Sequence, residues 1–292
     1  MYESTDGASL RSAAAEIGIN RNTLKAWVAR FSSNPRADSG LAGGVGSLGR
    51  MTRTLNMTVA LKALGEPAQC PALDHVRGQK VWFYPRHWLA RWPQGLEIPP
   101  LLQGDDDVDV RLAVTRDDLF ALAANGISTP SEAVNFYTAV CAWGTGPYVR
   151  GVSRVVRPLR DPLAPGRLLE GLAAAAECGA GSGDPVEIYR QFCRGGSWRI
   201  KYLGPAFFTK LMYFAAGAPV PPKAECSSTL KHPLILDSRV ARALGWSRRW
   251  GWSPEQYGDY LEAVEELRDL WRPEVPVDVV EYQLFITGGR KN

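Results

Sequence analysis

The sequence predicts a mainly α-helical fold, in which a helical bundle follows a small helical N-terminal unit. From residue 107 onward, apolar residues recur with a period near 3.6, the spacing of helices that bury one face. Helix-capping residues precede several of these stretches, and strands are hard to place after residue 107. Together these observations favour an all-α bundle for most of the chain.

Composition shifts predict four segments. Residues 1–38 form a small N-terminal unit, and residues 39–50 are rich in Gly and Ser without an aromatic residue, as in a flexible linker. Residues 51–106 match no pattern that we can assign, apart from an expected short strand at 80–84. The helical domain is expected to span residues 107–292.

The N-terminal unit has the pattern of two short amphipathic helices joined by a tight turn at Gly18. The spacing of Ala14, Gly18 and Leu24 resembles the helix-turn-helix of transposase-type and regulatory proteins. That resemblance implies a second helix in the DNA major groove, with base-facing residues Arg21, Asn22 and Lys25. The alternative is a helical hairpin that packs on another part of the protein.

In the helical domain, Thr, Ser or Asp caps and prolines at first helical positions mark the helix starts. The expected helices cover residues 115–125, 129–143, 164–178, 184–193, 205–216, 238–245, 253–271 and 276–287.

Composition excludes several classes of protein. No apolar run reaches the roughly 18 residues of a membrane span, and the first ten residues lack the regions of a signal peptide. The five cysteines are widely spaced, so we expect no metal, no cofactor and a cytoplasmic, nucleoid-associated protein. The net charge of the chain is +4, and its positive excess lies in residues 1–104, which permits an anionic partner.

The chemically informative stretch is 198–240. Gly204 and Pro205 predict a sharp turn between two helices, a helix-hairpin-helix in which the first helix ends near Tyr202. Lys210 follows within an aromatic run, where burial disfavours the ammonium form and so favours a nucleophilic amine. Asp237 comes after an apolar run and is expected to cap the next helix.

This hairpin, the lysine in its second helix and the later aspartate before Arg239 and Val240 resemble the helix-hairpin-helix DNA glycosylases. The closest likeness is to the 8-oxoguanine glycosylases, in particular the archaeal type, and it covers about 107–292. The chain departs from the family in having Leu-Gly-Pro-Ala where Gly-hydrophobic-Gly is common.

The resemblance implies that the chain is an enzyme of base excision repair whose partner is double-stranded DNA with a damaged base. The target nucleotide flips out of the duplex, Lys210 attacks the sugar to form a Schiff base, and Asp237 stabilises the sugar cation. AP lyase activity by β-elimination is expected to follow. Glu281 and Phe285, four residues apart on the last helix, would read and stack on the base, with 8-oxoguanine favoured.

Phosphate contacts are expected at the hairpin and along an arginine stripe spaced as one helix face. The candidates are Leu203, Gly204, Ala206, Arg239, Arg150, Arg154 and Arg157. We expect a monomer.

Two alternatives remain open on the sequence. The chain could be a DNA-binding protein without enzymatic activity, in which the helix-turn-helix and the hairpin only anchor. It could also be a monofunctional glycosylase, in which Asp237 activates water and Lys210 is structural.

Overall fold

The computed structural model describes residues 56–103, 110–221, 231–247 and 250–290. Within these ranges the fold is mainly helical, which confirms the predicted fold class. No helix in them is both long and apolar enough to cross a membrane. The proposed recognition residues Arg21, Asn22 and Lys25 lie outside the described residues.

The first part of the described chain consists of short elements. In chain order they are α3 (Met57–Leu64), the 3₁₀ turn η1 (Pro67–Gln69), α4 (Leu73–Arg77), β1 (Val81–Phe83), α5 (Pro85–Leu89), η2 (Pro100–Leu102) and β2 (Leu112–Val114).

The remaining elements are helical. They are α6 (Arg116–Ala124), α7 (Pro130–Thr145), α8 (Val149–Val156), η3 (Arg157–Arg160), α9 (Ala164–Gly179), α10 (Pro185–Phe192), α11 (Pro205–Ala215), α12 (Ser238–Ala243), α13 (Pro254–Trp271) and α14 (Val277–Gly289).

The helices begin where capping residues were expected. Thr115, Thr129 and Ser253 each open a capping box at the start of α6, α7 and α13. In each box the side-chain oxygen accepts a hydrogen bond from a backbone N–H that the helix itself leaves unpaired. The starts of these three helices therefore follow from local chemistry that the sequence displays.

The expectation that no strand follows residue 107 was wrong at one place. Residues 112–114 form β2, which pairs in antiparallel fashion with β1, so that Val81 lies opposite Val114 and Phe83 opposite Leu112. The strand predicted at 80–84 is the partner, observed at 81–83. A three-residue strand is too short to show a period of two, and its identity depends on a partner about 30 residues away.

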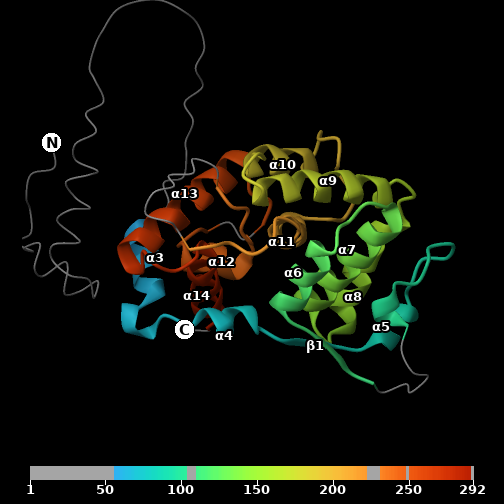
Figure 1. The fold of residues 1–292 in the computed structure, drawn as a ribbon, viewed down its shortest axis with the longest axis horizontal. Helices are drawn as coiled ribbons and strands as arrows, with labels where there is room; N and C mark the ends of the chain where they lie inside the picture. The colour runs from blue at the N-terminus through green and yellow to red at the C-terminus, as the bar shows by residue number, and fades with distance from the viewer. Residues whose placement is uncertain (1–55, 104–109, 222–230, 248–249, 291–292) are drawn as a thin grey trace, which may run out of the picture.

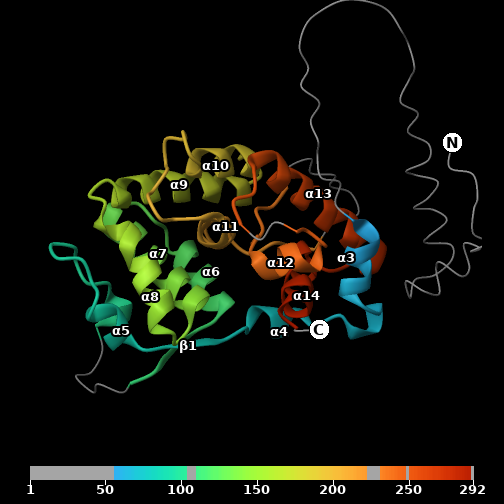
Figure 2. The same ribbon diagram turned by 180° about the vertical axis from the view of Figure 1, so that it is seen from behind.

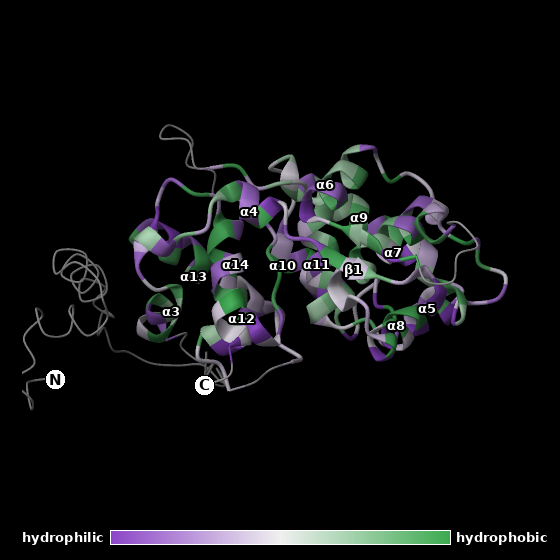
Figure 3. Ribbon diagram, turned by 90° about the horizontal axis from the view of Figure 1, so that it is seen from below, coloured by the Kyte–Doolittle hydropathy of each residue, from purple (hydrophilic) through white to green (hydrophobic). Residues whose placement is uncertain are grey.

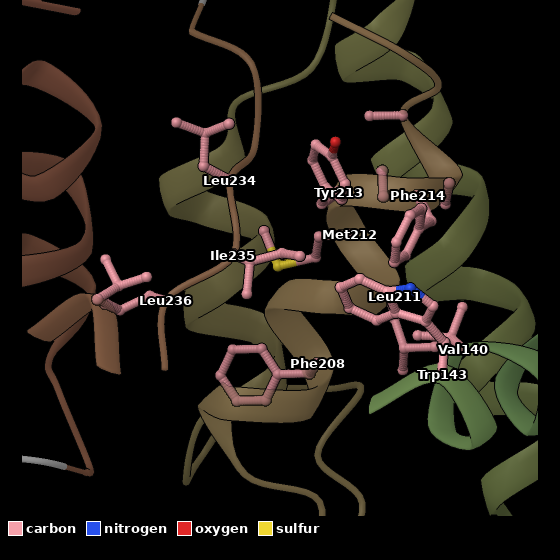
Figure 4. Packing of buried hydrophobic residues seen from close by; sticks show 14 of the residues in the cluster. Val140, Trp143, Phe208, Leu211, Met212, Tyr213, Phe214, Leu234, Ile235 and Leu236 are labelled. Atoms are coloured by element: carbon pink, nitrogen blue, oxygen red, sulfur yellow. The ribbon is translucent and has the colours of Figure 1, made fainter. Parts of the chain in front are cut away.

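Helix α11 occupies the centre of the molecule. Figures 1 and 2 show it between one group of helices, α6 to α9, and a second group made of α3 and α12 to α14. It contacts α6, α7, α9 and α10. Most of its residues from Phe208 onward are buried, and Figure 4 shows their side chains against Trp143 and the Leu234–Leu236 segment.

The helices around α11, such as α9 and α13, each bury one face. Figure 3 shows hydrophilic and hydrophobic residues alternating along them, as expected for helices that cover a common core. Residues 57–103 contribute to that same core, through side chains such as Leu64, Phe83 and Trp88.

The hairpin before α11 differs from the prediction. We expected a helix to end near Tyr202, but α10 ends at Phe192, and residues 193–204 form turns. Two glycines explain why no further helix forms in this segment, because Gly195 has a φ of 94° and a Cβ on Gly196 would lie 2.2 Å from the Gln191 carbonyl oxygen. The second helix of the hairpin begins at Pro205 as predicted.

Candidate active site

Lys210 and Asp237 lie together at the N-terminal half of α11. The Lys210 Nζ is 3.7 Å from Asp237 Oδ2, and the two side chains are 8% and 14% exposed. Nζ also donates a hydrogen bond to the Ala206 carbonyl oxygen at 2.7 Å, so the side chain runs back toward the start of the helix. The amine is therefore held between a carboxylate and a carbonyl, near the hairpin.

Asp237 uses its two oxygens differently. Oδ1 accepts hydrogen bonds from the backbone N–H groups of Arg239 at 2.8 Å and Val240 at 3.1 Å, which caps α12. Oδ2 faces Lys210. Because the cap occupies one oxygen, the orientation of the other toward the amine is fixed.

The extended segment Leu234–Leu236 positions Asp237. It has no strand partner among the described residues, so its backbone polar groups need other partners. The Tyr257 hydroxyl accepts a hydrogen bond from the Leu234 N–H at 3.1 Å and donates one to the Leu234 carbonyl oxygen at 3.0 Å. The Tyr260 hydroxyl donates to the Ile235 carbonyl oxygen at 2.7 Å.

Thr209 completes this support from α11. Its Oγ1 accepts a hydrogen bond from the Leu236 N–H at 3.1 Å, next to Asp237. Since Thr209 and Lys210 are adjacent on α11, one helix positions both the amine and the backbone that carries the carboxylate.

The C-terminal end of α7 covers the other side of Lys210. A Cβ added to Gly144 would lie 3.0 Å from the Phe207 ring and 3.3 Å from the Lys210 Cδ. Cys141, one turn earlier, is fully buried, and this burial raises the pKa of its thiol to about 12. The thiol therefore stays protonated near neutral pH and does not compete with the amine as a nucleophile.

Glu281 is buried and takes part in an ion pair. Its Oε2 accepts a hydrogen bond from Arg116 Nη1 at 2.9 Å, and each side chain is 1% exposed. Burial raises the pKa of Glu281 to about 7, although Arg116 acts in the opposite direction. The charge of Asp237 adds to this rise, so the last helix brings a second carboxyl group near the candidate pair Lys210 and Asp237.

Arg116 belongs to a larger buried network. It also donates to Gln79 Oε1 at 2.9 Å and to the Tyr213 hydroxyl at 3.1 Å, and Tyr213 in turn donates to Asp278 Oδ2 at 2.7 Å. Arg77 lies 3.3 Å from the same Asp278 oxygen. This network of buried polar side chains connects α4, α6, α11 and α14.

Phe285 lies one turn further along α14 and is partly buried. The Arg239 guanidinium is 4.7 Å from the centre of its ring. Arg239 itself is exposed at the first turn of α12. Phe285 and Arg239, both predicted from the sequence, therefore lie in contact, while Glu281 is engaged by Arg116.

The arginine stripe lies beside the hairpin. Arg150 and Arg154 are exposed on α8, and Arg157 is exposed at the start of η3. A groove separates α8 from the hairpin, and its lining includes predicted DNA-binding residues. The lining residues are Tyr137, Arg154, Val155, Arg157, Pro158, Tyr202, Leu203, Gly204 and Phe207.

The groove reaches close to the candidate catalytic amine. Phe207, which lines it, lies with its ring centre 5.6 Å from the Lys210 Nζ. Leu203 is buried, whereas Gly204 and Ala206 are partly exposed at the start of α11. No side chain caps this helix start. Pro205 has no N–H, and the N–H groups of Phe207 and Phe208 donate to the Gly204 carbonyl oxygen, which leaves the Ala206 N–H without a side-chain acceptor.

Sequence reasoning missed Arg116, Tyr213, Asp278 and the two tyrosines of α13. Arg116 follows a helix cap and precedes two aspartates, which is the pattern of an exposed first turn. Tyr213 is one of several aromatic residues on α11, and nothing in its spacing distinguishes it. In the described ranges, no group of three or more His, Cys, Asp or Glu residues is arranged to hold a metal ion.

A family model described as "Putative 8-oxoguanine DNA glycosylase OGG-like protein" matches residues 74–285. The match includes Lys210, Asp237, Glu281 and Phe285, and most of the described fold. No curated protein and no solved structure matches the chain significantly.

Proposed function

Because the chain belongs to the OGG-like family of 8-oxoguanine DNA glycosylase-like proteins, we propose that it excises an oxidised purine from double-stranded DNA. The observation that carries this proposal is the Lys210–Asp237 pair, buried beside the hairpin at 3.7 Å. 8-Oxoguanine is the proposed lesion, and a Schiff base on Lys210 is the proposed intermediate. DNA is the substrate that family membership implies.

In the proposed reaction the damaged nucleotide leaves the stack, which costs a few kcal/mol that contacts in the pocket offset. The Lys210 ammonium gives a proton to Asp237 Oδ2, the acceptor that faces it. The neutral amine then forms a bond to the anomeric carbon. The bond from that carbon to the base breaks, and its electron pair leaves with the base. The base takes up the proton that Asp237 had accepted, so Asp237 is a carboxylate again.

Asp237 has a second proposed task. While the bond to the base breaks, positive charge develops on the sugar, and a carboxylate held in a poorly solvated site stabilises that charge. The new amine then loses a proton and its nitrogen electron pair forms the C=N bond of the Schiff base. The bond from the anomeric carbon to the ring oxygen breaks, and that oxygen takes up the proton. Loss of a proton from the next sugar carbon and departure of the 3′ phosphate would complete β-elimination, which is the proposed AP lyase step.

The proposed base contacts come from the last helix. Phe285 stacks on the flipped base, and Glu281 accepts hydrogen bonds from the N1–H and 2-amino group of a guanine-type base. In that arrangement Arg116 holds the carboxylate in place, since it donates to Oε2 at 2.9 Å. The proposed phosphate contacts come from the arginine stripe and the start of α11.

One observation favours a second candidate, the monofunctional glycosylase. Lys210 Nζ lies between the Asp237 carboxylate and the Ala206 carbonyl, and two oxygen partners stabilise an ammonium ion. If the lysine keeps its proton, Asp237 would activate a water molecule for the attack on the sugar. Base release without a covalent intermediate distinguishes this reaction.

Borohydride trapping on a panel of duplexes, each with one damaged base, tests these proposals. We expect a covalent adduct with 8-oxoguanine DNA, lost in Lys210→Gln and retained in Lys201→Gln, whose lysine is exposed on the hairpin. Free base without an adduct would support the monofunctional reaction instead. If no duplex in the panel releases a base, the proposed excision is refuted.

A further inference from the structure

Tyr202 adopts an unusual backbone conformation in the hairpin. Its φ is 71°, and it is the only residue other than glycine with a positive φ among the described residues. This left-handed region is unfavourable for a side chain with a Cβ, and glycine is the residue that adopts it without strain. The hairpin turn alone would therefore favour glycine at position 202.

The ring of Tyr202 lies near two cations, the Lys201 Nζ at 5.2 Å and, much closer, the Arg157 guanidinium. The Arg157 guanidinium carbon lies 3.5 Å from the centre of the tyrosine ring, the shortest such contact in the described residues. Tyr202 is nevertheless 50% exposed. The contact is thus a cation stacked on an aromatic face at the surface, and it does not form part of the core.

This stack lies within the proposed DNA interface. Arg157 follows Arg150 and Arg154 in the arginine stripe, and both Arg157 and Tyr202 line the groove that ends at Phe207. Arg157 forms no ion pair with an acidic side chain in the described ranges, so its charge stays available. A guanidinium that rests on a ring has its donor plane fixed, and planar donors recognise phosphate oxygens in pairs.

We propose that Tyr202 is a positioning residue that fixes the Arg157 guanidinium for contact with a DNA phosphate. This inference rests on the proposed function, because it assumes that the stripe faces DNA. The strained backbone at position 202 directs the ring under Arg157. Preorganisation of the arginine then removes the entropy cost of ordering a long side chain when DNA binds.

Four variants test the proposal: Tyr202→Gly, Tyr202→Phe, Arg157→Ala and the double variant Tyr202→Gly with Arg157→Ala. The probe is a duplex with a tetrahydrofuran abasic-site analogue, which no glycosylase can process. Affinity is measured by fluorescence anisotropy at several salt concentrations, and thermal unfolding is measured in parallel. Glycine suits the turn, so Tyr202→Gly should unfold at the wild-type temperature or above it.

We expect Arg157→Ala to weaken binding about tenfold and to lower the salt slope by about 1, the loss of one phosphate contact. Tyr202→Gly should weaken binding roughly threefold to tenfold although the fold is intact, and Tyr202→Phe should bind like the wild type. Adding Tyr202→Gly to Arg157→Ala should cause no further loss, since the ring acts through the arginine.

The outcomes separate the two proposals. Wild-type affinity in Arg157→Ala would remove this arginine from the DNA interface and overturn both the inference and that part of the proposed function. A loss in Arg157→Ala with no loss in Tyr202→Gly would overturn the inference alone. Equal further loss in the double variant would also overturn it, because Tyr202 would then contact DNA independently of Arg157.

Discussion

Substitution of Asp237 by Asn separates its two structural tasks. An asparagine side-chain oxygen can still accept from the N–H groups of Arg239 and Val240, and Asn is as good a cap as Asp. The charge that faces Lys210 at 3.7 Å is lost, however. The variant thus keeps the start of α12 and removes only the carboxylate.

The expected magnitudes differ strongly. Asp237→Asn should destabilise the fold by about 1–2 kcal/mol, because a buried amine loses a charged partner but keeps the Ala206 carbonyl. Base release should slow by about 10²- to 10³-fold, the usual effect of losing one group that stabilises charge in the transition state. Asp237→Ala should cost about a further 1 kcal/mol of stability, since the cap is lost as well.

Single-turnover excision of 8-oxoguanine, with thermal unfolding in parallel, measures both effects. Asp184→Asn is the matched control, because Asp184 caps α10 through the Val186 N–H at 2.8 Å and is exposed. The control should retain full activity. Excision by Asp237→Asn within about threefold of the wild type would refute the assigned role of the charge, and an equal loss in Asp184→Asn would point to a general effect of the substitution.

Two further predictions concern α14. Gly288→Ala should destabilise the fold by about 1–3 kcal/mol, as measured by thermal unfolding. Its Cβ would lie 1.9 Å from the Arg239 carbonyl oxygen, so the backbones of α12 and α14 would have to separate. Gly289→Ala is the control, since its Cβ would meet only the flexible end of the Arg239 side chain at 3.1 Å; similar losses in both would exclude this explanation. Burial raises the pKa of Glu281 from 4.5 to about 7, so the folded state binds the proton more tightly and its stability should fall as pH rises through this window. As pH rises through this window, the free energy of unfolding of the wild type, measured with denaturant, should fall by on the order of 3 kcal/mol relative to that of Glu281→Gln. The same pH dependence in both proteins would contradict the raised pKa of Glu281.

The fold class and most helix bounds could be predicted because their signals are local. Thr115, Thr129 and Ser253 display helix starts within four residues of sequence, and Pro205 marks the start of α11 in the same way. The position of Asp237 at a helix start was also predictable from the apolar run before it.

The contacts between distant residues could not be predicted. Arg116 meets Glu281 across 165 positions, and nothing in either local pattern encodes the partner. The helix expected to end near Tyr202 is absent because the glycine pair before it was given no weight against an expected continuous hairpin. The contact between Arg157 and Tyr202 depends on a backbone conformation that the residue type disfavours, so propensity argued against it.

The extended segment before Asp237 also limits how this site could be transferred to another protein. Its backbone depends on hydroxyl groups of Tyr257 and Tyr260, some 20 positions later on α13, and on Thr209 of α11. A designer who grafts only the lysine helix and the aspartate loop onto a new scaffold would leave buried peptide groups without partners. The smallest unit that could be transferred therefore includes α11, the loop and the face of α13 that carries the two buried tyrosines. Two helices are needed to position the single carboxylate of Asp237.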